Sequence, residues 1–181
     1  GGHARSLLAG DQLLQPARAE LRVQAGEAGV RVGVPGVVAA GNNGWNADRQ
    51  QSGYGGITSP GNAPDAITVG AVDTKNTATR DDDVVAPYSS RGPTWFDAFA
   101  KPDVVAPGHH LTSDTNLSSY LYKLLPTGHV KSKNGQDLLQ LSGTSMAAAV
   151  TSGVVALMLQ EHNQSGYHQQ APLTANLVKA I

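Results

Sequence analysis

The stretch Leu141-Ser142-Gly143-Thr144-Ser145-Met146-Ala147 leads a polar, glycine-containing turn directly into a run of small and apolar residues that continues to Gln160. A helix built from this run is apolar on nearly every side, so the run predicts a helix that is buried all round. Thr144 and Ser145 then lie at the N-terminus of the helix, where free backbone N–H groups and the helix dipole favour negative charge.

Ser145 has two interpretations at this position. A serine hydroxyl there can attack a carbonyl carbon while the backbone N–H of the same residue donates to the oxyanion that forms. A serine or threonine before a helix is more often a simple N-cap. The motif alone therefore does not decide between a nucleophile and a cap.

The composition indicates one compact domain with little net charge. The chain has 181 residues, of which 13 are basic and 14 acidic, so a nucleic acid or an anionic membrane is not indicated as a partner. Cysteine is absent, which excludes disulfides, thiolate metal sites and a cysteine nucleophile. No apolar run reaches the roughly 18 residues of a membrane span.

The hydrophobic pattern predicts an α/β protein. Valine-rich segments without polar alternation are typical of strands that are buried on both faces of a parallel sheet. Segments with apolar residues three and four positions apart predict helices. The expected elements, in chain order, are a helix at 11–29, strands at 36–40, 67–72 and within 101–108, a long mixed excursion at 111–141, the central helix, and a further helix from 173.

Two clusters have the residue types of metal ligands without the spacing. Asp81, Asp82 and Asp83 could offer oxygen ligands to calcium, but the ligand spacing of a calcium loop is absent and a solvated loop fits better. His109 and His110 are adjacent, so their side chains are expected to point in different directions and to form a poor chelate. The sequence therefore predicts no metal site and no cofactor.

A second candidate residue lies far from Ser145 in the chain. Acyl-transfer chemistry needs another oxyanion donor that converges on the nucleophile from elsewhere in the fold. Asn42 can supply a side-chain N–H from the turn 41–44, which directly follows an expected strand. In open α/β sheets ligands bind beyond the carboxyl ends of the strands. The alternative is an asparagine that only shapes the turn.

Five segments occur in the order in which they occur in the subtilisin-like serine proteases (subtilases), and the segment around Ser145 resembles their nucleophile segment closely. One such segment is a weak signal, but five in the same order make coincidence very unlikely. The resemblance covers about residues 30 to 181. The segments are Val38-Ala39-Ala40-Gly41-Asn42-Asn43-Gly44, Ser59–Val72, Tyr88–Pro93, Lys101–Gly108 and Ser142–Ala148.

This resemblance implies a fold and a role for each matched residue. The implied fold is a three-layer α/β sandwich of the subtilisin type with a largely parallel sheet. Ser145 matches the nucleophile and Asn42 the oxyanion donor, while Ala39, Ala40 and Gly41 match the segment that lines the specificity pocket. The implied function is a secreted or extracytoplasmic serine endopeptidase that acts on proteins or peptides through an acyl-enzyme. Calcium often stabilises the family, but no segment here shows a site that we can name.

The chain also departs from the family pattern. The catalytic aspartate and histidine of subtilases lie well before the asparagine segment, and neither motif is present here. His3 lacks the surrounding pattern and is too close to Asn42 in the chain. Ala149 and Val150 stand where the family usually has a Pro-His pair, and the spacing from Gly108 to Leu141 is longer than in compact members. We therefore expect residues 1–181 to be the C-terminal portion of a single catalytic domain, incomplete at the N-terminus and inactive alone.

Two alternatives from other classes remain open. An α/β-hydrolase places its acid and its histidine after the nucleophile, but no aspartate follows Ser145. His162 would lie 17 positions further along the same helix. At ~1.5 Å per residue this is about 25 Å from Ser145, too far for a base. The second alternative is a non-catalytic subtilase-like domain that binds a partner or serves as a scaffold. Cleavage preference and oligomeric state are not indicated.

Overall fold

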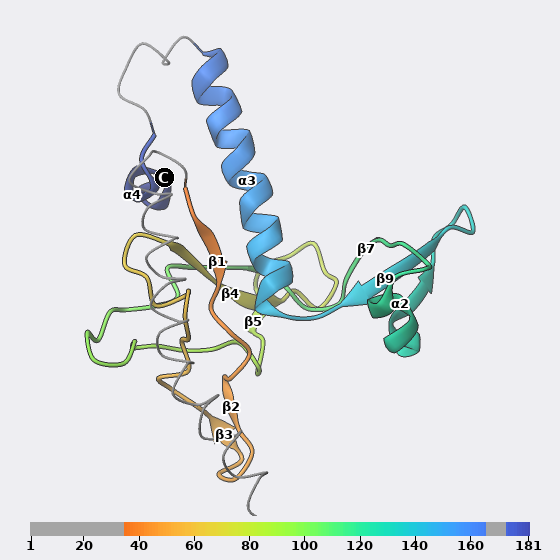
Figure 1. The fold of residues 1–181 in the computed structure, drawn as a ribbon, viewed down its shortest axis with the longest axis horizontal. Coiled ribbons are helices and arrows are strands. Elements are labelled where there is room, and N and C mark those ends of the chain that lie inside the picture. Colours follow the sequence, from red (N-terminus) through yellow and green to blue (C-terminus); the bar gives the residue numbers. More distant parts are fainter. Residues whose placement is uncertain (1–34, 166–172) are drawn as a thin grey trace, which may run out of the picture.

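The computed structural model describes residues 35–165 and 173–181, so the helix predicted at 11–29 lies outside the described residues (Figure 1). The centre of the fold is a four-stranded sheet built around β4 (Ile67–Asp73). β1 (Val37–Ala39) and β6 (Val104–Pro107) both pair with β4 in parallel, and β5 (Val84–Val85) pairs with it in antiparallel. The prediction of a largely parallel sheet is confirmed, whereas the three-layer arrangement stays a prediction.

The sheet register brings three strand ends to one edge. Val37 lies opposite Ile67 on one side of β4, and Val69 lies opposite Val104 on the other. Six of the seven residues of β4 are buried, as expected for the central strand of a parallel sheet. Because parallel strands share a direction, the segments that follow β1, β4 and β6 all leave the sheet at its carboxyl edge, where ligands bind in such folds.

Helix α3 (Thr144–Gln164) packs across β1, β4 and β6. Its buried residues Ala147 and Val155 join the hydrophobic core of the sheet. The shorter α4 (Ala175–Ala180) adds Val178 to this core, and the Thr174 side chain caps α4 by accepting a hydrogen bond from the Leu177 N–H. The helices predicted around Ser145 and after 173 are therefore both present.

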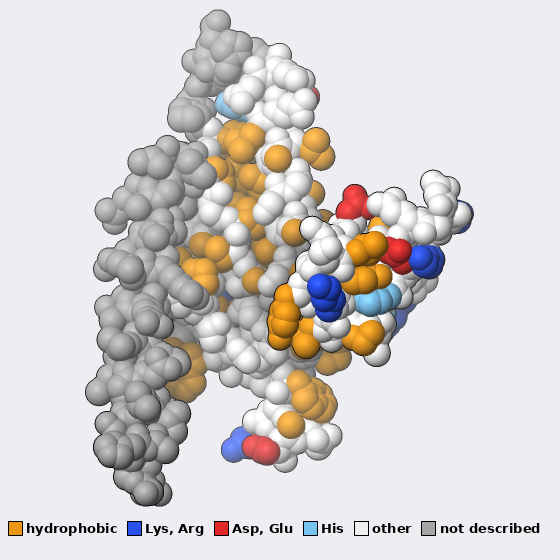
Figure 2. All heavy atoms as spheres, turned by 45° about the vertical axis from the view of Figure 1, so that its right-hand side comes forward, with side chains coloured by type: hydrophobic (Ala, Val, Ile, Leu, Met, Phe, Trp, Pro, Cys, Tyr) orange, Lys and Arg blue, Asp and Glu red, His pale blue; other side chains and the backbone are white. Residues whose placement is uncertain are grey.

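The prediction that the central helix is buried all round is wrong for the described residues. Val150, Val154 and Leu157 are 37%, 51% and 66% exposed. One face of α3 rests on the sheet, but no described element covers the opposite face. Figure 2 shows hydrophobic side chains along the exposed side of this helix. Composition predicts the apolar character of such a helix and cannot tell how many of its faces have a partner.

The expected excursion forms an extension that projects away from the sheet (Figure 1). Its three strands form a separate antiparallel sheet in the order β7-β9-β8, with a short helix beside them. The Ser119 hydroxyl accepts a hydrogen bond from the Tyr122 N–H and so caps that helix. The elements are β7 (Leu111–Asp114), α2 (Tyr120–Leu124), η1 (Pro126–Gly128), β8 (His129–Lys131) and β9 (Asp137–Leu141).

A small hairpin completes the described elements. β2 (Trp45–Asn46) pairs in antiparallel with β3 (Gln51–Ser52), directly after the turn that follows β1. Among the helices within residues 35–165 and 173–181, none has the length and apolar character needed to cross a bilayer.

Candidate active site

The fold brings Asn42 and Ser145 together at the carboxyl edge of the sheet. Asn42 follows the end of β1, and Ser145 lies in the first turn of α3. Both residues are exposed, and the buried Thr144 connects them because it bonds to Asn42 and directly precedes Ser145. The two candidates from the sequence, 103 positions apart, are therefore neighbours in space.

Thr144 fixes the orientation of the Asn42 side chain. The backbone N–H and the hydroxyl of Thr144 donate hydrogen bonds of 3.0 and 3.1 Å to Asn42 Oδ1. A backbone N–H can only donate, so the amide oxygen must face Thr144 and the NH2 group must face away from it. Asn42 Nδ2 lies 3.4 Å from the point that a Cβ on Gly143 would occupy. The Asn42 donor is therefore held beside the start of α3.

The backbone N–H of Ser145 is a second available donor. In the first turn of α3, the N–H groups of Met146 and Ala147 donate to the Gly143 carbonyl over 3.1 and 3.4 Å, and the Thr144 N–H donates to Asn42. Within the described residues, the Ser145 N–H makes no hydrogen bond. Two donors from different elements thus stand at the start of α3, an arrangement that can stabilise an oxygen as it gains negative charge.

The turn that carries Asn42 is held by the segment after β5. Ser90 donates its N–H to the Gly41 carbonyl over 2.9 Å, and its Oγ accepts from the Asn43 N–H over 3.0 Å. The Gly44 N–H donates to the Tyr88 carbonyl over 2.8 Å. Gly44 is buried so closely against this segment that a Cβ there would collide with the Ser89 carbonyl. The position of Asn42 is therefore set on both sides.

The end of β6 holds the turn that carries Ser145. The Gly143 N–H and the Tyr88 hydroxyl both donate to the Gly108 carbonyl over 2.9 Å. Burial raises the pKa of the Tyr88 hydroxyl, which keeps the proton that it donates. The His110 N–H donates to Ser142 Oγ over 2.9 Å. These bonds tie the turn that carries Ser145, the nucleophile turn of the sequence-based prediction, to the carboxyl edge of the sheet.

Ala39 is the last residue of β1, and Ala40 and Gly41 lead from it into the turn that carries Asn42. Gly41 has a φ of +104°, which favours glycine, and a Cβ there would lie 2.9 Å from Ser90 Oγ and 3.4 Å from Thr58 Oγ1. Ala40 has no exposed surface. The Ala39–Gly41 backbone thus runs beside the loop that contains Thr58, and its role in binding substrate stays a prediction.

A general base for Ser145 is not found in the described part of the chain. Within residues 35–165 and 173–181, no histidine hydrogen-bonds to the Ser145 hydroxyl. His129 bonds to the Tyr122 carbonyl over 2.7 Å, and His109 faces Asp73. His162 stands in the last turn of α3, at the far end of the helix from Ser145. His3 lies outside the described residues.

The structure shows the arrangement of the two clusters that have the residue types of metal ligands, the adjacent histidines and the acidic loop. The rings of His109 and His110 do not diverge as predicted, but stack with centroids 4.0 Å apart, and His110 has a φ of 54° that turns its side chain back. In the acidic loop, Asp82 accepts from the Thr77 hydroxyl over 2.8 Å and the Asp83 carboxylate pairs with Arg80 over 3.2 Å. Within the part that the structure describes, no group of three or more His, Cys, Asp or Glu side chains could hold a metal ion.

Comparison of the sequence with known protein families identifies the family of this chain. The family model of the Subtilase family matches residues 12–181. The chain belongs to the subtilase family. It is 43% identical over 140 residues to the serine protease AprX of Bacillus subtilis, covering 77% of this chain and 29% of AprX. It is 40% identical over 79 residues to the subtilisin-like protease SBT3.8 of Arabidopsis thaliana, covering 43% of this chain and 9% of that protease.

Solved structures give the same fold. Sphericase superposes with a TM-score of 0.57 and 27% identity, over 87% of this subtilase chain and 41% of sphericase. A PatG macrocyclase in complex with peptide gives a TM-score of 0.56 at 23% identity, over 89% of this chain and 36% of that protein. The subtilisin-like fold and the serine protease family are therefore established, and the chain spans less than half the length of each of these relatives.

The sequence alone does not identify the residues whose hydrogen bonds hold Asn42 and the turn of Ser145 in place in this subtilase. The sequence places Thr144 only at the helix start, although it is the partner of Asn42. Tyr88 and Ser90 lie in a segment that resembles the family, and this resemblance is the available signal. It identifies the segments but not the hydrogen bonds between them.

Proposed function

We propose that this subtilase chain supplies the nucleophile and the oxyanion-binding groups of a serine endopeptidase that hydrolyses proteins or peptides. The observation that carries this proposal is the Asn42 amide, which Thr144 holds with its NH2 group turned away, next to the free N–H of Ser145. An asparagine that only shapes a turn does not need two hydrogen bonds from a buried threonine at the start of another element.

In the proposed reaction, Ser145 Oγ attacks the carbonyl carbon of the scissile bond and transfers its proton to a base. The carbonyl oxygen becomes an oxyanion, which the Ser145 N–H and the Asn42 amide stabilise. When the tetrahedral intermediate collapses, the carbon–nitrogen bond breaks, the amine takes a proton and leaves, and the acyl group stays on Ser145. Water then releases the acid and restores the hydroxyl.

We assign the base to a part of the full-length protein outside this chain, which spans 29% of the length of AprX. Two apolar hollows beside α3 support this assignment. One, of about 670 Å³, lies between α3 and the extension and is lined in part by Leu139, Leu141 and Met146. The other, of about 330 Å³, lies between α3, β6 and α4. Together with the exposed face of α3, they form a surface that the rest of the catalytic domain would cover.

The absence of a described base also keeps a second function open, namely a non-catalytic subtilase-like domain that binds a partner or serves as a scaffold. Hydrolysis of a fluorogenic peptide by the full-length protein distinguishes the two. The catalytic proposal requires turnover that Ser145→Ala abolishes and that Ser152→Ala, a change of another exposed serine of α3, preserves. An esterase is less favoured because His162 stands at the wrong end of α3. Secretion stays a prediction from the family resemblance.

A further inference from the structure

A polar pocket lies at the carboxyl edge of the sheet, where β4 and β6 end. It has a volume of about 240 Å³ and is distinct from the two apolar hollows beside α3. The turn after β4 supplies one wall and the turn after β6 supplies the other. The polar pocket is lined by Asp73, Thr74, Lys75, Asn76, His109 and His110.

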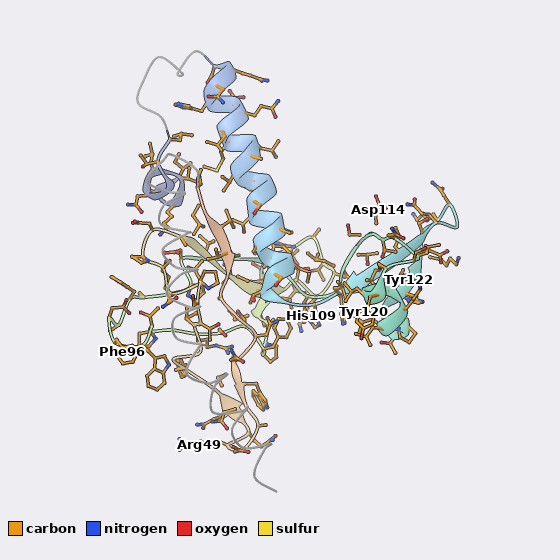
Figure 3. The ribbon with its side chains drawn as sticks, viewed as in Figure 1. Arg49, Phe96, His109, Asp114, Tyr120 and Tyr122 are labelled. Atoms are coloured by element: carbon orange, nitrogen blue, oxygen red, sulfur yellow. The ribbon has the colours of Figure 1, made fainter. Side chains whose placement is uncertain are left out.

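The polar pocket is joined directly to the nucleophile turn. The His110 N–H donates to Ser142 Oγ over 2.9 Å, and the adjacent Gly108 carbonyl accepts from the Gly143 N–H over 2.9 Å. Figure 3 shows His109 at the base of α3, near the point from which the extension departs. The pocket is therefore hydrogen-bonded to Ser142, which precedes the proposed nucleophile Ser145 by three positions in the chain.

The pocket and Asn42 approach the nucleophile turn from different strands. Asn42 follows β1 and bonds to Thr144, whereas the pocket follows β4 and β6, and β4 separates β1 from β6. If Ala39–Gly41 line the pocket for the acyl side of the substrate, as the family resemblance predicts, the leaving part is expected on the side of β6. This step rests on the proposed function and gives the pocket a place along the same substrate.

The side chains of the pocket offer hydrogen-bond donors to a ligand. The only carboxylate among them, Asp73, is already paired, since Lys75 Nζ lies 2.6 Å from Oδ2 and the Lys75 N–H lies 3.0 Å from Oδ1. The hydrogen bond from the Lys75 side chain is the main cause that lowers the pKa of Asp73, so this carboxylate is ionised at neutral pH. The Lys75 ammonium carries three donors and is half exposed, and His110 and Asn76 are exposed beside it.

The backbone of the pocket holds these donors in uncommon conformations. Lys75, Asn76 and His110 have φ values of 51°, 58° and 54°, in the left-handed region. Such conformations are uncommon for residues other than glycine, although asparagine and histidine adopt them more readily than most, and they gather at ligand clamps and active sites. All three of these residues line the polar pocket.

We propose that the polar pocket binds a carboxylate of the substrate on the leaving-group side of the scissile bond. A carboxylate accepts from several donors at once and forms strong hydrogen bonds with an ammonium or imidazolium group. It has two sources in a peptide, an acidic side chain or the C-terminus of a short leaving peptide. Both present the same group to Lys75 and His110.

Steady-state kinetics with the full-length protein test this proposal. Matched fluorogenic peptides carry Glu or Gln at the second and third positions after the scissile bond, each with a free or an amidated C-terminus. We expect kcat/KM to favour the carboxylate peptides on the order of tenfold, the value of one charge-assisted hydrogen bond. Lys75→Gln should bring this ratio close to one, whereas Lys133→Gln, at the exposed tip of the extension, should preserve it. The Glu/Gln pair and the free/amidated pair separate the two carboxylate sources.

A binding measurement separates this proposal from the proposed function. The full-length Ser145→Ala variant is titrated with fluorescent peptides that match the leaving part, and the dissociation constant is read from polarisation. If the carboxylate peptides bind more tightly than their neutral counterparts, and Lys75→Gln abolishes this difference, the proposed carboxylate site is supported even if no peptide is cleaved. Equal binding of the Glu and Gln peptides with either C-terminus, or a preference for lysine, would overturn it.

Discussion

The Thr144 hydroxyl lies 3.1 Å from Asn42 Oδ1, and the Thr144 N–H lies 3.0 Å from the same oxygen. The two hydrogen bonds join the end of β1 to the start of α3 and fix the orientation of the Asn42 amide next to Ser145, the proposed nucleophile. Thr144 is 1% exposed, so water does not compete for these bonds. The amide is therefore oriented before any substrate arrives, which is the condition for stabilising a transition state without reorganisation.

Replacing Asn42 by alanine should slow the chemical step of the full-length enzyme. The loss of the side-chain donor should lower kcat on the order of 10²–10³-fold, or about 2.7–4 kcal/mol, with KM nearly unchanged. This magnitude is the established one for the equivalent donor of subtilisin, a member of the same family. Asn42→Asp should be no better, because it places a negative charge where the oxyanion forms. A wild-type kcat in Asn42→Ala would make Asn42 only a turn residue.

Thr144→Val should have a smaller effect of the same kind. It removes the hydroxyl that donates to Asn42 and accepts from the Gly41 N–H over 3.1 Å, but it keeps the backbone N–H bond. We expect kcat to fall by up to about tenfold, the value of one hydrogen bond, with little change in KM. In the Asn42→Ala background the Thr144→Val change should cost much less, because its partner is gone. Equal costs in both backgrounds would show that Thr144 does not act through Asn42.

The isolated 181-residue chain should have essentially no protease activity. Without a base within about 2.6–3.2 Å, the Ser145 hydroxyl stays neutral and poorly nucleophilic. The assay measures cleavage of casein and of a fluorogenic peptide by the purified chain, with Ser145→Ala as the control. Turnover that depends on Ser145 would show that a histidine of this chain serves as the base, contrary to our account.

Two glycine substitutions should change stability in opposite directions. Gly44→Ala places a methyl group against the Ser89 carbonyl and 2.8 Å from the Pro87 carbonyl oxygen, so it should lower the free energy of unfolding by about 3 kcal/mol or more. Gly153→Ala in α3 meets no atom within 4 Å and should raise it by about 1 kcal/mol, the difference in helix propensity. Urea unfolding of the purified 181-residue chain measures both changes, because the face of α3 that carries Gly153 is uncovered there. A neutral Gly44→Ala would mean that the Asn42 turn is not held as tightly as described.

The ion pair between the buried Lys101 and the partly exposed Asp103 should make stability depend on pH in the acid range. Lys101 Nζ lies 2.7 Å from Asp103 Oδ2, and the Thr68 N–H donates to the same oxygen over 2.7 Å. Burial alone would raise the pKa of Asp103, but the hydrogen bonds from Lys101 and Thr68 lower it below its ordinary value. A carboxylate with a lowered pKa in the folded state contributes stability above its unfolded pKa of about 3.9, and this contribution is lost as the pH falls further.

Urea unfolding of the protein and of its Asp103 variant between pH 6 and pH 2.5 measures how the free energy of unfolding depends on pH. Asp103→Asn should reduce the loss of unfolding free energy below about pH 4, whereas Asp48→Asn, an exposed loop variant with the same change in charge, should not. The same slope in Asp103→Asn and in the parent protein would rule out this pair as its source.

The sequence predicts the elements because each depends on local pattern. The valine-rich segments indicate β1, β4 and β6, and the apolar run after Ser145 indicates α3. The proximity of Asn42 and Ser145 could be predicted from the order of the matched segments. It also follows from the rule that the carboxyl ends of parallel strands lie at one edge of the sheet.

Other features could not be predicted because they depend on contacts far apart in the chain. The Thr144–Asn42 bond spans 102 positions and requires the register of β1 against β4. The exposed face of α3 reflects which partners are present and not the composition of the helix. The stacking of His109 on His110 accompanies a φ of 54° at His110 in the turn after β6, which residue spacing alone does not indicate.

Covalent labelling of the full-length protein by a fluorophosphonate tests the central claim most directly. An activated serine nucleophile beside an oxyanion site displaces fluoride and keeps the phosphonyl group, and peptide mass spectrometry locates the adduct. We predict a single adduct on Ser145, which Ser145→Ala abolishes and Asn42→Ala slows on the order of 10²-fold or more. A protein that hydrolyses peptides but carries the adduct on another serine, or that carries none, would contradict the assignment of Ser145 as the nucleophile.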